Sequence, residues 1–206
     1  MATEPDADRI GIAVKNTEGD WVLLNGNMTG SLLVGYILEA WKNTKGFAGN
    51  EYIVKTIVTT QLMDAIAAHY GVKCYNTLTG FKFIGSLMTS LESKEQFIVG
   101  GEESYGYLVG DHVRDKDAIV SAVMIAEMAA YYKDQGSSLY DALINLYVEH
   151  GFYKERLITV TKKGKAGAEE ILAIMAEFRT SPPSNLGGSR LIEVKDYASG
   201  EAKNLL

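Results

Sequence analysis

Apolar and polar positions alternate in a regular order through the first 150 residues of the chain. Short apolar runs rich in β-branched residues are typical of buried strands, and such runs occur at 52–58, 72–75 and 97–99. Apolar residues that recur every three or four positions predict amphipathic helices at 29–42, 62–70 and 81–91. Strands that alternate with helices predict an α/β fold, a layered domain with a mixed, mostly parallel sheet between helices.

Two polar loops follow predicted strands of this sheet. The segment 77–80 comes after one strand, and the segment 100–107 comes after the next. In a parallel sheet the loops at the carboxyl ends of the strands gather on one edge. We therefore expect both loops on the same edge of the domain.

The pattern differs at the start of the chain and in the 117–150 region. Two β-type runs, 10–14 and 21–24, flank a glycine-containing loop and predict a hairpin. The segment 117–132 is nearly all apolar, which predicts a buried central helix. A further helix is predicted after Ser138, which forms a capping-box pattern with Asp141.

The register changes again after Gly151. An extended run at 155–163, a helix at 168–178, a turn region at 182–188 and a strand at 191–195 follow one another. These elements are too few to bury a core of their own. We therefore divide the chain into a 1–9 loop, a 10–151 α/β domain and an incomplete C-terminal α+β segment at 152–206.

Composition excludes several classes of function. The chain has 206 residues, a formal net charge of -6 and a pI near 5.2, which argue against binding to nucleic acid or to an anionic membrane surface. Its one cysteine, Cys74, excludes an intrachain disulfide, and no apolar run is long enough to cross a membrane. The N-terminus does not resemble a signal peptide, so a cytoplasmic location is expected.

The segment 101–117 carries the most suggestive chemistry. Glu102, Glu103 and Ser104 accept hydrogen bonds and Ser104 also donates, a combination that suits the hydroxyls of a polyol. Arg114 and Lys116 add cationic donors for a phosphate or a carboxylate. The alternative interpretation is a solvated loop that caps the next helix.

Three carboxylates alternate at the N-terminus, at Glu4, Asp6 and Asp8. Oxygen ligands of this kind suit Mg²⁺ if the loop curls around the ion. The spacing does not fit an EF-hand, and an Asp-x-Asp phosphatase loop would follow a strand, whereas this cluster precedes one. A solvated acidic tail is the alternative interpretation.

Five short motifs follow one another along the chain. They are Glu-Pro-Asp-Ala-Asp-Arg at 4–9, Leu-Asn-Gly-Asn-Met-Thr-Gly at 24–30, Thr-Leu-Thr-Gly-Phe-Lys at 77–82, Gly-Glu-Glu-Ser-Tyr-Gly at 101–106 and His-Val-Arg-Asp-Lys-Asp at 112–117. Together, and in this order, they resemble the phosphoglucomutase/phosphomannomutase family, the α-D-phosphohexomutases. Phosphomannomutase-type relatives place Gly-His after the Glu-x-Ser core, where this chain has Tyr105-Gly106. The resemblance is therefore to the phosphoglucomutase-like branch.

Members of that family have four domains, and the resemblance covers only some of them. It implies a chain that begins at the Asp-rich metal loop, contains the third, sugar-reading domain and stops inside the fourth, phosphate-binding domain. The Ser-His-Asn motif of the phosphorylated serine and the Arg-x-Ser-Gly-Thr loop of the fourth domain are both absent from the sequence.

The resemblance also implies roles at the acidic loop. Asp6 and Asp8 would be Mg²⁺ ligands, and Mg²⁺ is the expected cofactor. Glu4 stands where the family usually has Asp, so its carboxylate is displaced by one methylene. Arg9 would lie beside the metal and the phosphoserine.

Further roles are implied at the other motifs. Glu102 and Ser104 would hold ring hydroxyls, Thr79 and Gly80 would form a substrate-facing loop, and Arg114 would contribute to substrate binding. Lys116 would be a general acid or base if nearby cations such as Arg114 lower its pKa, which Asp115 and Asp117 would oppose.

Three hypotheses of function follow. The first is the sugar-recognition and Mg²⁺-binding part of an isomerase that moves a phosphoryl group between the 1- and 6-positions of a hexose phosphate. That reaction proceeds through a phosphoserine and a bisphosphate intermediate, and the chain alone is expected to be inactive. Its partners would be glucose or mannose 1- and 6-phosphates and the remaining domains of the same polypeptide. The others are a stand-alone sugar-phosphate-binding module without catalysis and an unrelated Mg²⁺-dependent phosphatase.

Overall fold

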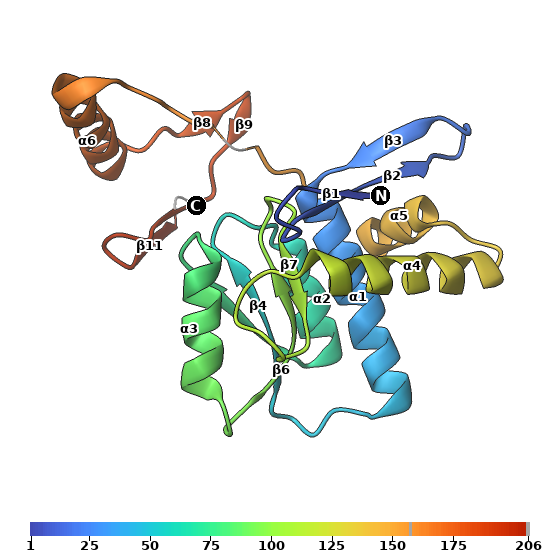
Figure 1. Cartoon of the computed structure of the whole chain (residues 1–206). Helices are drawn as coiled ribbons and strands as arrows, with labels where there is room; N and C mark the ends of the chain where they lie inside the picture. The colour runs from blue at the N-terminus through green and yellow to red at the C-terminus, as the bar shows by residue number, and fades with distance from the viewer. Residues whose placement is uncertain (157, 205–206) are drawn as a thin grey trace. The chain divides into compact units, whose positions relative to one another are not determined.

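The computed structural model describes residues 1–156 and 158–204. It contains two compact units, Met1–Glu155 and Arg156–Leu206, which are coloured blue to gold and orange to red in Figure 1. The boundary lies close to the change of register predicted after Gly151.

A four-stranded sheet forms the middle of the first unit. Its strand order is β5-β4-β6-β7. β4 pairs in parallel with β5 and β6, whereas β7 is antiparallel to β6, so the predicted mixed, mostly parallel sheet is confirmed. The strand bounds are Glu51–Thr56 for β4, Lys73–Thr77 for β5, Gln96–Gly101 for β6 and Tyr107–Val109 for β7.

Helices cover both faces of this sheet. Alternate residues of the strands point to opposite faces. Tyr52 and Val54 pack with the apolar face of α3 (Phe81–Leu91), whereas Ile53 packs in a second core with α1 (Gly26–Thr44) and α2 (Leu62–Tyr70). Figure 1 shows α3 on one side of β4 and the other two helices on the opposite side, which confirms the layered α/β prediction.

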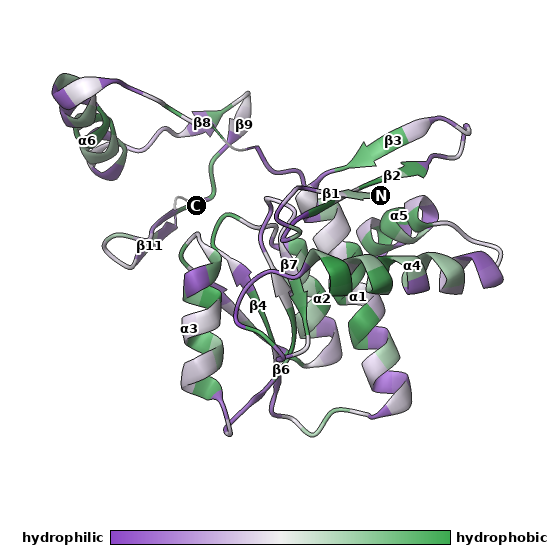
Figure 2. Ribbon diagram, viewed as in Figure 1, coloured by the Kyte–Doolittle hydropathy of each residue, from purple (hydrophilic) through white to green (hydrophobic). Residues whose placement is uncertain are grey.

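A small antiparallel sheet precedes these layers. β2 (Ile10–Lys15) and β3 (Trp21–Leu24) form the predicted hairpin, and the ribbon of β2 carries the apolar colour in Figure 2. The short β1 (Ala2–Thr3), which the sequence pattern did not predict, pairs with β2. The 4–9 loop is therefore held at both ends by strands of one sheet.

The prediction of a helix buried on most sides at 117–132 is wrong. α4 (Ala118–Asp134) buries Ala118, Ser121, Ile125 and Met128, which form one stripe at helical spacing. Ile119 and Val123 lie on another face and are 60% and 61% exposed. The start of α4 is strongly hydrophobic in Figure 2, but apolar composition cannot specify which faces of a helix have neighbours.

Caps explain where the helices of the first unit begin. Asn25 accepts a hydrogen bond from the Met28 N–H at 2.9 Å, so α1 begins three residues before the predicted Thr29. Ser138 and Asp141 form the predicted capping box at the start of α5 (Leu139–His150). A turn that joins the Thr59 N–H to the Thr56 carbonyl ends β4 earlier than the predicted 52–58 run.

The described residues of the second unit form one helix and two short hairpins. α6 (Gly164–Thr180) is longer than the predicted 168–178 helix. β8 (Asn185–Leu186) pairs with β9 (Ser189–Arg190) around two glycines, and β10 (Glu193–Asp196) pairs with β11 (Glu201–Asn204). The described residues of the predicted extended run 155–163 form no strand, and Leu157 lies outside the described residues.

None of the helices in the described part of the chain combines the length and the apolar character needed to span a membrane.

Candidate functional site

Glu102 joins two loops at the carboxyl edge of the sheet. The 102–106 loop connects β6 to β7, and the 78–80 loop connects β5 to α3. Glu102 is only 4% exposed, and its Oε1 accepts a hydrogen bond of 2.8 Å from the Gly80 N–H. Within the described residues its Oε2 has no hydrogen-bond partner, so that oxygen is available to a ligand. The two polar loops lie on one edge, as the sequence predicts.

The backbone of Gly80 explains why glycine stands there. Its φ is +115°, a conformation that residues with a Cβ atom rarely adopt. Gly80 precedes α3 directly, and its N–H holds the Glu102 carboxylate. Thr79 beside it is exposed to solvent. The 78–80 loop thus presents one polar side chain outward and one backbone donor inward.

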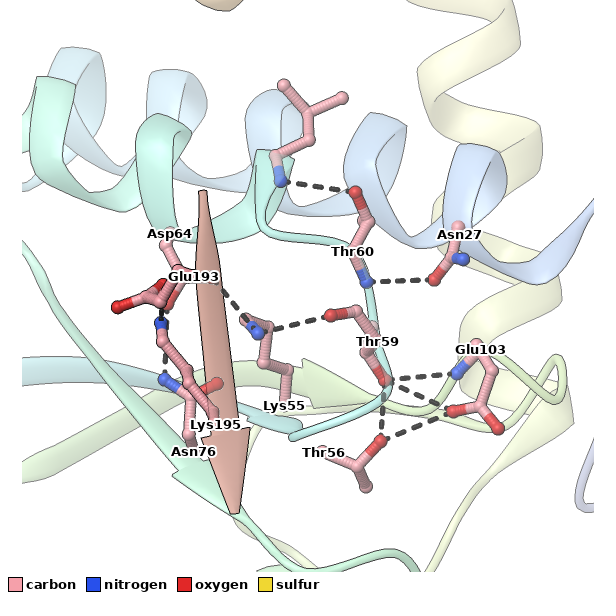
Figure 3. Close-up of polar contacts among 11 residues, drawn as sticks. Asn27, Lys55, Thr56, Thr59, Thr60, Asp64, Asn76, Glu103, Glu193 and Lys195 are labelled. Carbon is pink, nitrogen blue, oxygen red and sulfur yellow. Dashed lines mark hydrogen bonds and ion pairs between the residues drawn. The ribbon is translucent and has the colours of Figure 1, made fainter. Parts of the chain in front are cut away.

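Glu103 points toward the sheet and anchors the 102–106 loop (Figure 3). Its Oε2 accepts hydrogen bonds of 3.2 Å from the hydroxyls of Thr56 and Thr59, which are themselves 2.7 Å apart. The Glu103 N–H donates to Thr59 Oγ1 at 3.2 Å. Sequence reasoning missed both threonines, although two hydroxyls at the end of a buried strand were a visible signal.

Lys55 is a second group that the sequence pattern did not single out. It is 2% exposed, and its Nζ lies 3.0 Å from Asp64 Oδ2 and 3.1 Å from the Thr59 carbonyl oxygen (Figure 3). A buried ammonium group is tolerated only when it is paired and hydrogen-bonded. Lys55 therefore fixes the turn that carries Thr59, and through it the Glu103 anchor.

The three carboxylates of the 4–9 loop converge. Glu4, Asp6 and Asp8 each place a ligand oxygen within 4.8 Å of the others. Glu4 Oε1 is buried and accepts no hydrogen bond from any described residue, while the Arg9 Nε lies 3.5 Å away. The nearby Asp8 carboxylate, followed by burial and by Asp6, raises the pKa of Glu4. The arrangement concentrates negative charge as a divalent cation site requires.

Lys116 joins this acidic loop from the segment before α4. Its Nζ lies 2.9 Å from Asp8 Oδ2 and 3.0 Å from Asp115 Oδ1. Burial opposes the charged form, but the bonds to Asp8 and Asp115 dominate and raise the pKa of Lys116. Lys116 is therefore positively charged at neutral pH, and the lowered pKa that the sequence argument considered is not observed.

Glycine is required where the Lys116 stem packs. A Cβ atom on Gly106 would lie 2.1 Å from Cδ of Lys116. Carbon atoms that are not bonded to each other do not approach so closely. Gly106 thus lets the lysine stem pass over the 102–106 loop and reach Asp8.

Backbone hydrogen bonds join the acidic loop to the 102–106 loop. The Ile10 N–H donates to the Tyr105 carbonyl at 3.1 Å, and Arg9 forms a β-bridge with Gly106. Ala7 and Tyr105 have φ angles of +57° and +70°, which are uncommon for residues other than glycine. Such strained residues concentrate at functional sites.

A shallow hollow opens where these loops meet. Glu4, Arg9 and Ser104 are among the residues that line it, and its volume is about 540 Å³. It therefore brings together a carboxylate, a guanidinium group and a hydroxyl from two loops. These groups can bind a ligand that carries both hydroxyls and negative charge.

Arg114 and Asp117 are held by neighbours in the segment before α4. Arg114 Nη2 lies 3.3 Å from Glu92 Oε1, and its Nη1 donates to the carbonyl of Asp111 at 2.6 Å. Asp117 caps α4 through the N–H groups of Ile119 and Val120. His112, followed by these N–H groups, lowers the pKa of Asp117. The structure thus places Arg114 beside the end of α3, where its charged partner is Glu92.

A family model described as phosphoglucomutase/phosphomannomutase, alpha/beta/alpha domain III, matches residues 25–147. Phosphoglucomutases of Staphylococcus epidermidis and Staphylococcus aureus are 35% and 34% identical to this chain over 205 residues. These alignments cover 100% of this chain but only 37% and 36% of the two relatives. The chain thus spans little more than a third of the relatives that it matches.

Solved structures show the same fold. A putative phosphomannomutase from Thermus thermophilus superposes with a TM-score of 0.57 at 25% identity, over 72% of this chain and 30% of that one. Parafusin, a phosphoglucomutase from Paramecium, superposes with a TM-score of 0.63 at 21% identity, over 98% of this chain and 34% of that one. An Aspergillus fumigatus N-acetylphosphoglucosamine mutase, solved with GlcNAc-6P and magnesium, gives a TM-score of 0.51 at 16% identity, over 68% of this chain and 33% of that one.

Proposed function

The chain belongs to the phosphoglucomutase/phosphomannomutase family, and we propose that it is the sugar-recognition and Mg²⁺-binding part of a phosphohexomutase. The reaction of that enzyme moves a phosphoryl group between the 1- and 6-positions of a hexose phosphate. It uses a phosphoserine as donor and a hexose bisphosphate as intermediate. The phosphoserine belongs to a part of the enzyme that this chain does not include.

The junction of the 4–9 and 102–106 loops is the observation that carries this proposal. Lys116 bonds to Asp8 at 2.9 Å, and Ile10 bonds to the Tyr105 carbonyl at 3.1 Å. Polar groups for sugar hydroxyls and carboxylates for a cation therefore occupy neighbouring positions on one edge of the domain. Phosphoryl transfer depends on this combination of positioning and charge stabilisation.

Sugar recognition is assigned to groups of both edge loops. The free Oε2 of Glu102 accepts hydrogen bonds from ring hydroxyls, and the Ser104 hydroxyl accepts or donates. Thr79 and Gly80 flank them, and Gly80 fixes the Glu102 carboxylate from the other side. The GlcNAc-6P and magnesium complex of an Aspergillus fumigatus mutase of this fold supports a hexose phosphate as the ligand.

Charged groups are assigned to the phosphate and to proton transfer. Arg9, beside the acidic loop, and Arg114, at the end of α3, supply guanidinium donors that suit phosphate oxygens. Lys116 is protonated in its contact with Asp8, so it serves as a proton donor in the arrangement seen here. It can accept a proton only after that ion pair is broken.

Glu4, Asp6 and Asp8 fit a magnesium ion. Their donors are carboxylate oxygens, and the buried Glu4 Oε1 accepts no hydrogen bond from the described residues. The extra methylene of Glu4 does not remove its carboxylate from the cluster, because its oxygen still lies within 4.8 Å of those of both aspartates. Mg²⁺ held by these carboxylates would offset negative charge on the oxygens of the transferred phosphoryl group.

Binding and turnover by the purified chain test the proposal. We expect glucose 1-phosphate to bind with a dissociation constant of about 1 mM, because only part of the site is present. Glu102→Gln and Ser104→Ala should each weaken binding by about tenfold, since each removes a hydrogen-bonding group that the ligand uses. Glu18→Gln, a matched charge change in an exposed turn of the β2–β3 hairpin, should leave the affinity unchanged.

Three outcomes would count against the proposal. Equal affinities for the wild type and the Glu102→Gln variant would contradict sugar recognition by the 102–106 loop. Interconversion of glucose 1-phosphate and glucose 6-phosphate by the chain alone would contradict the expectation that this part of the enzyme is inactive by itself. Release of inorganic phosphate from the sugar phosphate would support a phosphatase instead.

A further inference from the structure

A second group of metal-ligating side chains lies at the far end of α2. His69 is in the last turn of α2, and Glu149 and His150 are the last residues of α5. His69 Nδ1 is 3.5 Å from Glu149 Oε1, and His150 Nε2 is 3.9 Å from Glu149 Oε2. One ligand atom from each of the three residues lies within 4.8 Å of the other two.

This cluster is separate from the candidate sugar site. α2 begins at Leu62, directly after the turn that carries Thr59 and the Glu103 anchor. His69 comes seven residues after Leu62, which at about 1.5 Å per residue places it roughly 10 Å farther along the helix. None of the roles proposed above uses His69, Glu149 or His150.

The surroundings of the cluster favour a cation. Two helices end there, and the carbonyl groups at a helix C-terminus carry a partial negative charge. The side chains of His69 and Glu149 are 44% and 53% exposed, so an ion can reach them from solvent. The His150 side chain is only 7% exposed, and its ring stands edge-on to that of His69 with 5.3 Å between centroids.

We propose that His69, Glu149 and His150 form a binding site for a divalent transition-metal ion, and that Zn²⁺ is the metal that fits it best. Two imidazole nitrogens and one carboxylate oxygen are ligands that Zn²⁺ prefers, with water in the fourth position. Mg²⁺ prefers oxygen ligands alone and does not compete for this set.

The ligand spacing is close to that of a bound ion. Ligand atoms about 2.1 Å from a tetrahedral Zn²⁺ lie roughly 3.4 Å from one another. His69 Nδ1 and His150 Nε2 approach different oxygens of Glu149, at 3.5 Å and 3.9 Å, and one ligand atom of each residue lies within 4.8 Å of the other two, so the ligand atoms must move together by up to about 1.4 Å around an ion. The exposed side chains of His69 and Glu149 can move toward His150, which burial holds in place.

The state of His150 also suits a ligand. Burial, opposed by Glu149 and assisted by His69, lowers the pKa of His150. A neutral imidazole has a free lone pair, which is the form that binds metal. The ring of Tyr70 packs against His69 with 4.9 Å between centroids, and its hydroxyl donates to Glu39 at 2.7 Å, so the His69 side of the site has fixed neighbours.

A bound ion would join α2 to α5. The two helices are separated by more than 60 residues of sequence, and their ends are bridged in the described structure by the His69–Glu149 contact. Zn²⁺ binding to the folded chain should therefore raise its thermal unfolding temperature by mass action. This stabilisation does not depend on the proposed function.

Calorimetric titration of the tag-free chain with Zn²⁺ tests the proposal. Millimolar Mg²⁺ is included to occupy the carboxylates of the 4–9 loop. We expect one Zn²⁺ per chain with a dissociation constant in the micromolar range. His69→Ala and Glu149→Gln should each weaken binding by at least about tenfold, because each removes one of three protein ligands. His69 and Glu149 are exposed, so these variants should fold.

Matched variants and a spectroscopic probe complete the test. His112→Ala removes a histidine that pairs with Asp117 outside the cluster and should leave Zn²⁺ affinity unchanged. Co²⁺ bound in place of Zn²⁺ should give visible absorption bands of nitrogen ligation, and His150→Ala should abolish them. Zn²⁺ affinities equal to wild type in His69→Ala and Glu149→Gln would overturn the proposal. The proposal would also be overturned if the chain bound no Zn²⁺, or if only the Asp6→Asn variant lost Zn²⁺ binding.

Discussion

Gly26 is the position where a single methyl group should displace the 102–106 loop. A Cβ atom there would lie 1.9 Å from the Glu103 carbonyl oxygen, 2.6 Å from the Glu103 carbonyl carbon and 2.8 Å from the Tyr105 nitrogen. All three are backbone atoms, so no side-chain rotation relieves the contact. Since real Cβ contacts stay above 3.0 Å, the loop must move by at least 1.1 Å in the Gly26→Ala variant.

The expected cost of Gly26→Ala has a structural and a functional part. Overpacking of this kind destabilises a folded protein by about 1–3 kcal/mol. For a unit of about 150 residues this lowers the thermal unfolding temperature by roughly 2–12 °C. The shift also carries Ser104 and the Glu103 anchor, so binding of glucose 1-phosphate should weaken, since a displacement of about 1 Å in a positioning group can cost about a hundredfold in function.

Gly11→Ala is the matched control, because a Cβ atom on Gly11 would meet nothing within 4 Å. Both variants would be compared with the wild type by differential scanning calorimetry and by calorimetric titration with glucose 1-phosphate. Gly11→Ala should keep the wild-type unfolding temperature. If the Gly26→Ala variant kept the wild-type unfolding temperature and the wild-type affinity for glucose 1-phosphate, the close approach of α1 to the 102–106 loop would be refuted.

Two further predictions concern the anchor and the acidic loop. Thr59→Val removes a hydroxyl that bonds to both the carboxylate and the N–H of Glu103. The free energy of unfolding in urea should therefore fall by about 1–3 kcal/mol. The control, Thr44→Val at an exposed helix end, should change that free energy by less than about 0.5 kcal/mol. Equal losses in the two variants would contradict the anchor. The raised pKa of Glu4 means that its carboxyl group keeps a proton at a pH where an ordinary Glu, with a pKa of about 4.3, has lost it. The affinity for Mg²⁺, measured by calorimetry, should therefore reach its full value above the raised pKa of Glu4 and fall as the pH falls through that pKa. The Glu4→Gln variant should lose this pH dependence. The same pH profile in the wild type and the variant would contradict the assignment of Glu4 as a ligand.

Periodicity predicted the layers of the fold because those layers are set by local sequence. The fully buried β4 and the stripe of α3 each carry their own signal, and strand–helix alternation leaves few arrangements of the sheet. α4 shows the limit of this reasoning. Its composition indicates burial, but Ile119 and Val123 are exposed because no described residue covers their face.

The candidate site was predictable where one motif carried several groups. Glu102 and Ser104 stand in one loop, and the convergence of Glu4, Asp6 and Asp8 follows from their alternate spacing in a tight turn. Contacts between distant segments were not predictable. The Lys116–Asp8 ion pair joins positions more than 100 residues apart, so it depends on the tertiary fold.

The charge state of Lys116 was only partly predictable. Asp115, its neighbour along the chain, was expected to oppose a lowered pKa and does contact Lys116, but the second partner, Asp8, comes from a distant segment. A pKa depends on neighbours in space, and only some of these are neighbours in sequence. The His69–Glu149–His150 cluster was likewise invisible, because its members come from the ends of two helices that are far apart in sequence.

Nuclear magnetic resonance of the ¹⁵N-labelled chain tests the central claim most directly. Glucose 1-phosphate would be titrated in the presence of Mg²⁺, and the amide shifts would be mapped onto the structure. The account predicts the largest changes at Gly80, whose N–H bonds to Glu102, at Ser104 and at the amides of the 4–9 loop. Changes confined to other surfaces, or the same shifts in the Glu102→Gln variant, would contradict a sugar-phosphate site at the junction of these loops.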